Sequence, residues 1–121
     1  MSKLIGLVSI AVSSVGIFFG FYYHFSDNPA LGLAIVTATT VGIVGALAWL
    51  RHFIFHKDDA KMIGWETERP DWMFEVGFAN LGFGFMGLLA VFANLGAEAQ
   101  AVALLGYALY LFQASMLHGY R

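Results

Sequence analysis

Two histidines and an aspartate follow one another at helical spacing near the middle of the chain. His52, His56 and Asp59 occupy positions i, i+4 and i+7, which share one face of a continuous helix. Two imidazoles and a carboxylate form a ligand set that suits zinc or a similar divalent cation. The alternative is a group of solvated side chains at a helix end, since no glutamate of an HExxH motif accompanies the histidines. The spacing leaves both interpretations open.

Glu75 is the carboxylate that stands closest to a long apolar run. It precedes an unbroken apolar segment, so we expect it about one turn inside a membrane boundary. A carboxylate at that depth is costly and by default indicates function. A structural role fits the position as well, because a glutamate in the first turn of a helix favours the helix dipole and could pair with Arg51 or Arg69.

Further polar side chains fall in the same half of the molecule. Tyr110, Gln113, Glu75, His52 and His56 form one candidate polar cluster, since all are expected near one end of the helices. An amide such as Gln113 serves more often as a hydrogen-bond partner between helices than as a substrate ligand. If the cluster binds anything, we expect a cation or a proton.

Catalytic patterns do not emerge from these residues, and an enzyme is the less favoured interpretation. The sequence holds no GxSxG elbow and no credible Ser–His–Asp set. No catalytic residue is predicted, and no cofactor is predicted beyond a possible divalent cation. The net charge of −2 speaks against nucleic acid as a partner, which would require a basic patch.

The composition indicates what holds these side chains in place. The 121 residues are 60% hydrophobic and 12% charged, whereas a soluble domain is nearer half apolar and a quarter charged. A core of this size could not hide the excess, so we expect a lipid-facing surface. Apolar segments at about residues 4–23, 31–55, 72–92 and 99–117 are long enough to cross a bilayer. They predict an all-α polytopic membrane protein, a single domain of residues 1–121 built as a bundle of four transmembrane helices.

The basic residues predict the orientation of these helices. With four crossings, all of them fall on the side of the charged loop at about residues 56–71. The positive-inside rule makes that side cytoplasmic, together with both termini. The residues are Lys3, Arg51, Lys57, Lys61, Arg69 and Arg121.

Small residues recur along the predicted helices and favour close packing. Small side chains let helix backbones approach one another in lipid, where no hydrophobic effect drives helices together. Faces left over would suit a second copy or another membrane protein, so the leading functional hypothesis is a homo-oligomer or accessory subunit. The alternative is a transport or sensing protein with a cation or proton site at the cytoplasmic end. The predicted packing residues are Gly6, Gly16, Gly20, Gly42, Gly45, Gly77, Asn80, Gly84 and Gly87.

One block of the sequence carries a family resemblance. Ile63-Gly64-Trp65, then Pro70, then Phe74-Glu75-Val76-Gly77-Phe78-Ala79-Asn80-Leu81-Gly82-Phe83-Gly84 resembles a domain-of-unknown-function family of small four-helix prokaryotic membrane proteins. The similarity covers mainly residues 56–87. It implies a multi-pass protein of the inner membrane of a bacterium or archaeon, and it brings no activity and no functional residues.

Overall fold

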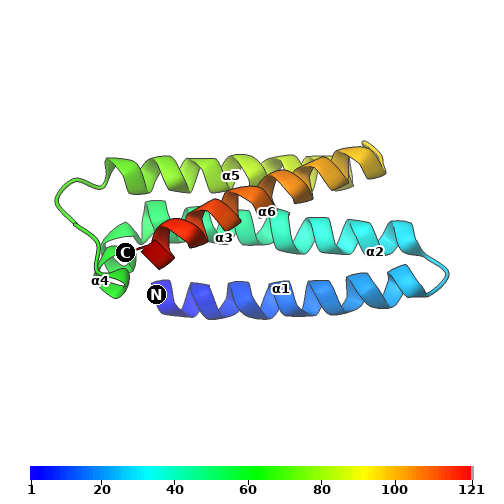
Figure 1. The fold of residues 1–121 in the computed structure, drawn as a ribbon, viewed down its shortest axis with the longest axis horizontal. Helices are drawn as coiled ribbons and strands as arrows, with labels where there is room; N and C mark the ends of the chain where they lie inside the picture. The colour runs from blue at the N-terminus through cyan, green and yellow to red at the C-terminus, as the bar shows by residue number, and fades with distance from the viewer. Residues whose placement is uncertain (121) are drawn as a thin grey trace.

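Four helical spans lie side by side along the long axis of the molecule (Figure 1). The structure is a computed structural model and describes residues 1–120. The first span is α1 (Ser2–Phe25), the third is α5 (Asp71–Phe92) and the fourth is α6 (Ala97–Tyr120). The second is built from α2 (Pro29–Val36), η1 (Thr37–Ile43), α3 (Val44–Trp49) and η2 (Leu50–Ile54). All four are long and apolar enough to cross a membrane, and the prediction of an all-α fold is confirmed for the described residues.

Sequence signals mark the turns between the spans. The side chain of Asn28 accepts a hydrogen bond from the backbone N–H of Leu31 at 3.1 Å, and Pro29 stands at the first helical position of α2. Between α5 and α6 the chain turns through Asn94 and Gly96, with φ of 53° and 98°. These left-handed conformations suit asparagine and glycine best, which fixes this connection.

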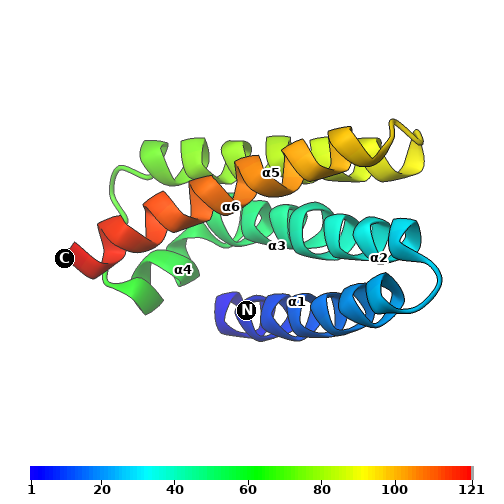
Figure 2. The same ribbon diagram turned by 45° about the vertical axis from the view of Figure 1, so that its right-hand side comes forward.

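The second span departs from a regular α-helix twice. Its segments η1 and η2 are π-helical, with one extra residue per hydrogen-bonded turn. After η2 the backbone of Phe55 leaves helical geometry (φ −102°, ψ 27°), and its N–H bonds to the carbonyl of Leu50 at 3.1 Å. The short helix α4 (His56–Ile63) then starts in a new direction (Figures 1 and 2). The second span therefore ends close to the predicted residue 55. The continuous helix through Asp59 that the metal-site argument required does not form, because the π-helical turn and Phe55 break its phase.

The ends of the chain gather with α4. The first turn of α1 and the last turn of α6 lie at the end of the molecule where α4 lies, which we call the α4 end (Figure 1). α6 crosses the other spans obliquely and packs on α5, η1 and α2, whereas α1 packs on the second span and on α4 (Figure 2). Arg121, one of the basic residues used to predict orientation, lies outside the described residues.

Glycines bring α3 and α5 into backbone contact. A Cβ atom added to Gly45 would lie 2.6 Å from the carbonyl oxygen of Asn80 and 2.8 Å from Cα of Gly84. One added to Gly84 would lie 3.0 Å from the carbonyl oxygen of Gly42. Only residues without side chains allow this approach, and it holds the middle of the second span against α5.

The remaining predicted packing glycines differ in how closely they are packed. Added Cβ atoms at Gly16, Gly20 and Gly42 would clash with Thr39, Val36 and Leu88, respectively. One at Gly87 would lie 2.8 Å from Val41. Two others have more room, with the nearest atoms at 3.6 Å for Gly6 and 3.4 Å for Gly77.

Replacement of Gly45 by alanine tests the backbone contact. We expect Gly45→Ala to lower the free energy of unfolding by about 1–3 kcal/mol, because the methyl group meets the backbone of α5 at Asn80 and Gly84. The control is Gly82→Ala on α5, where nothing lies within 4 Å of the added atom. That variant should be neutral or more stable by up to about 1 kcal/mol, since alanine favours a helix over glycine. Denaturation of the detergent-solubilised variants measures both, and equal stability of the two would contradict the contact.

Candidate functional site

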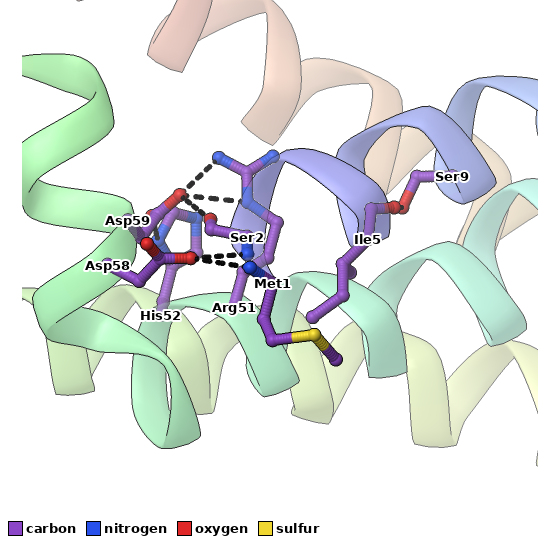
Figure 3. A network of polar contacts seen from close by, with 8 residues as sticks. All are labelled: Met1, Ser2, Ile5, Ser9, Arg51, His52, Asp58 and Asp59. Atoms are coloured by element: carbon purple, nitrogen blue, oxygen red, sulfur yellow. Dashed lines mark hydrogen bonds and ion pairs between the residues drawn. The ribbon is translucent and has the colours of Figure 1, made fainter.

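A buried carboxylate organises the α4 end (Figure 3). Asp59 is completely shielded from solvent, and its Oδ1 accepts three hydrogen bonds. Nε and Nη2 of Arg51 donate at 2.9 and 2.7 Å, and the hydroxyl of Ser2 donates at 2.6 Å. A buried charge persists only when it is paired and hydrogen-bonded, and Arg51 supplies the matching positive charge.

The second oxygen of Asp59 faces an imidazole. Nδ1 of His52 lies 2.8 Å from Oδ2, and neither atom has another hydrogen-bond partner among residues 1–120. A carboxylate oxygen only accepts, so Nδ1 is the protonated ring nitrogen at this contact. Asp59 therefore joins one residue of α1 to two residues of η2.

The neighbouring carboxylate ties down the start of α1. Oδ2 of Asp58 accepts from the backbone N–H of Ser2 at 2.6 Å and lies 2.9 Å from the Met1 amino nitrogen (Figure 3). Together with the Ser2–Asp59 contact, these bonds span more than 50 positions of the sequence. We call Ser2, Arg51, His52, Asp58 and Asp59 the α4 clamp.

Both carboxylates of the α4 clamp are held in the ionised form. Burial alone would raise the pKa of Asp59, but the hydrogen bonds from His52, Ser2 and Arg51 and the charge of Arg51 outweigh it and hold that pKa well below its usual range. For Asp58, the backbone N–H of Ser2 and then the amino terminus lower the pKa. The clamp is consequently an ionic structure at neutral pH.

A cavity of about 570 Å³ opens beside the clamp, between α1, α3, α5 and α6. Arg51 and His52 belong both to the clamp and to the wall of this cavity. The other polar groups of the wall come mainly from α6, and apolar side chains make up much of the remainder. The wall consists of Ser9, Val44, Ala48, Arg51, His52, Trp65, Trp72, Val76, Asn80, Tyr107, Tyr110, Leu111, Gln113, Ala114, Ser115, Leu117 and His118.

Asn80 connects α5 to two tyrosines of α6 at the cavity wall. Its side chain is 3% exposed, so an unpaired amide there would be costly. Nδ2 donates to the carbonyl of Val76 at 2.8 Å and to the hydroxyl of Tyr110 at 3.3 Å, while Oδ1 accepts from the hydroxyl of Tyr107 at 2.7 Å. Every polar atom of the Asn80 side chain is satisfied.

Aromatic rings enclose the cavity where the chain connects α4 to α5. The ring of Trp65 stacks on His118 with centroids 5.3 Å apart and on His52 at 6.2 Å, and it meets Trp72 at 4.0 Å. Gly64, in a left-handed conformation with φ of 75°, ends α4 directly before Trp65. The reversal at Gly64 brings the indole of Trp65 against His52 of η2 and His118 of α6.

The predicted polar cluster is divided in the structure. His52, Tyr110 and Gln113 line the cavity, but Glu75 lies on an exposed face of α5 and is absent from the cavity wall. His56 also points elsewhere, since its Nδ1 lies 3.0 Å from the carbonyl oxygen of Phe53 and its ring packs against Phe74 at 5.0 Å.

The predicted metal ligands do not share one site. His52 contacts Asp59, whereas His56 contacts Phe53 and Phe74, because Phe55 interrupts the helix on which the i, i+4, i+7 argument depended. Within residues 1–120, no group of three His, Asp or Glu side chains is arranged to hold a metal ion.

Sequence reasoning missed Ser2 and Asp58. It used Arg51 to predict the orientation and as a possible partner of Glu75, but did not pair it with Asp59. Ser2 gave no signal, because nothing in its local sequence indicates a bond to a residue 57 positions away. Arg51 and Asp59 are 8 positions apart, which a continuous helix would not bring into contact in this way. The break at Phe55 creates that pair.

Comparison with known protein families gives a match over nearly the whole chain. A family described as "Family of unknown function (DUF6790)" matches residues 4–121. No curated protein and no solved structure matches the chain.

Removal of the positive partner tests the α4 clamp. We expect Arg51→Met to lower the free energy of unfolding by about 3 kcal/mol, because the Asp59 carboxylate stays buried with its main counter-charge gone. Lys57→Met, an exposed basic residue of α4, is the matched control and should change stability little. Unfolding curves in detergent measure both, and an Arg51→Met variant as stable as the control would show that the buried pair does not hold this end together.

The depressed pKa of Asp59 predicts a pH dependence of known sign. A carboxylate whose pKa is lower in the folded state stabilises the fold above its unfolded pKa, about 3.9, and loses this contribution as the pH falls toward the folded value. The wild type should therefore lose more stability than Asp59→Asn between pH 5 and about pH 2. Thermal unfolding midpoints across that range measure the difference, and parallel curves for the two proteins would contradict the assignment.

Proposed function

Because the chain belongs to the DUF6790 family, whose function is unknown, we propose from its geometry that it is a membrane protein that binds a small, mostly apolar molecule in the cavity beside the α4 clamp. The single observation that carries the proposal is the cavity itself. Its volume of about 570 Å³ lies within the range of small-molecule sites. Its wall combines aromatic and aliphatic side chains with a few convergent polar groups, as such sites do.

The outer surface supports a position in the bilayer. Large apolar side chains are exposed along the spans, including Phe18 (65%), Phe85 (63%), Val102 (70%) and Leu105 (71%). In water such a surface would promote aggregation, whereas in lipid it costs nothing. We place the α4 end on the cytoplasmic side of a prokaryotic inner membrane, because the exposed Lys57 and Lys61 lie there and basic residues favour that side.

A homo-oligomer or accessory subunit stays the second candidate. The glycine faces that motivated it are used within the chain, since Gly16, Gly20, Gly45 and Gly84 contact neighbouring spans. A small-residue position in the middle of α5 supports the candidate: Gly82 is exposed, with nothing within 4 Å of an added Cβ. A partner helix could approach α5 closely there.

A cation or proton site built from Glu75, His52 and His56 receives less support. The three side chains point to different surroundings, so a shared ion would require rearrangement of α4 and η2. Of the three, only His52 lies at the cavity wall.

A cavity-filling substitution tests the proposal, with 2-methylnaphthalene as the probe. We expect the wild type in nanodiscs to bind this flat hydrocarbon beyond the amount that empty nanodiscs absorb. Ala114→Phe places a phenyl ring in the cavity wall and should weaken binding by about tenfold or more, or about 1.4 kcal/mol. Ala108→Phe, on the exposed side of the same helix, should leave binding unchanged.

Equilibrium dialysis measures the bound probe, and native mass spectrometry of the same samples reports the oligomeric state. Equal binding by all three proteins, or none beyond the empty nanodiscs, would reject the cavity as a binding site. A stable oligomer that Gly82→Leu dissociates would favour the second candidate.

A further inference from the structure

We propose that the ligand of this cavity carries a carbonyl oxygen on a flat ring, as quinones do, and that the hydroxyl of Tyr110 donates a hydrogen bond to that oxygen. The inference rests on the proposed binding function and specifies the chemistry of its ligand. It follows from the direction of each hydrogen bond around Asn80.

The orientation of the Asn80 amide is fixed by its own helix. The carbonyl of Val76 can only accept a hydrogen bond, so the atom 2.8 Å from it must be the amide nitrogen. Oδ1 therefore faces the hydroxyl of Tyr107, which must donate its proton across 2.7 Å. The hydroxyl proton of Tyr107 is therefore donated to Asn80 and is not available to a ligand.

By the same reasoning, the hydroxyl proton of Tyr110 has no acceptor among the described residues. Nδ2 of Asn80 has one hydrogen on Val76 and points the other at the hydroxyl oxygen of Tyr110, 3.3 Å away. Tyr110 thus accepts from Asn80, and its own O–H is directed away from the amide. No described residue accepts that proton, while Tyr110 lines the cavity. The cavity wall therefore presents an oriented donor.

The charges of the wall favour an acceptor as well. No aspartate or glutamate is among the residues that line the cavity in the described chain, so a cation would find no carboxylate there. The guanidinium of Arg51 binds Asp59 through Nε and Nη2, and Nη1 makes no hydrogen bond within residues 1–120. Gln113, one turn beyond Tyr110 on α6, adds an amide donor. Because the charge of Arg51 is already balanced by Asp59, an uncharged molecule with acceptor oxygens matches these groups best.

The aromatic walls indicate a flat ligand. The rings of Tyr107 and Tyr110 lie at 14° to one another with centroids 6.1 Å apart, and Trp65 and His118 lie at 15°. Aromatic faces pair favourably with other flat rings in offset or edge arrangements. A ring carbonyl can meet the Tyr110 hydroxyl while the ring contacts these walls.

Two probes of the same shape test the inference: 2-methyl-1,4-naphthoquinone, which carries ring carbonyls, and 2-methylnaphthalene, which lacks them. The wild type in nanodiscs should prefer the quinone by several-fold after partition into empty nanodiscs is subtracted. Tyr110→Phe should weaken quinone binding about three- to tenfold, the value of one hydrogen bond, and leave hydrocarbon binding unchanged. Tyr22→Phe, an exposed tyrosine of α1, is the matched control. The chain has no cysteine, so thiol addition to the quinone cannot confuse the measurement.

The outcomes separate this inference from the proposed function. If neither probe binds, the cavity is not a ligand site and both proposals fail. If both probes bind equally to the wild type, or if Tyr110→Phe affects them equally, the carbonyl assignment fails and the binding function stands. Dihexanoyl phosphatidylglycerol is the third probe, with phosphate oxygens as acceptors. Binding of this lipid that depends on Tyr110, without such dependence for the quinone, would overturn the ring carbonyl in favour of a lipid phosphate.

Discussion

The ion pair between Arg51 and the buried Asp59 is the interaction on which the α4 end depends. A carboxylate removed from water must find several donors at once, and Asp59 finds them on two different spans. This requirement fixes where α4 lies, where α1 begins and how η2 ends. Because Arg51 and His52 also line the cavity, the same interaction positions the polar side of the candidate site. Packing of small residues holds the rest of the spans, but this end is held by charge.

The irregular second span makes that arrangement possible. The π-helical turn at η2 and the non-helical Phe55 turn the chain so that Asp59 returns toward Arg51. A regular helix would present His52 and His56 on one face. Here His52 contacts the carboxylate of Asp59, whereas His56 packs against Phe74. Departures of this kind are rare in helices and often occur at functional sites. Here the irregular segment η2 contributes Arg51 and His52 both to the α4 clamp and to the wall of the cavity.

Much of the architecture can be predicted from the sequence, because lipid allows few alternatives to long apolar helices. The four spans and the glycines between α3 and α5 follow from composition and spacing. The family membership agrees with the resemblance of residues 56–87 and extends it to residues 4–121. Tyr110, Gln113 and His52 were also expected near one another, and they line one cavity. The clamp could not be predicted, since it depends on one backbone break and on a serine 57 positions from its partner. Local spacing carries no information about either.

The position of the clamp along the chain bears on the order of assembly during synthesis. All its residues, and the close contacts of Gly16 and Gly20 with the second span, lie within the first 59 positions. The first two spans and α4 can therefore form their mutual contacts before α5 has left the ribosome. α5 and α6 would then dock on a preformed surface, and the cavity would come into existence only at that last step. An insertion intermediate stopped after α4 should already be ordered, yet have no place for a ligand.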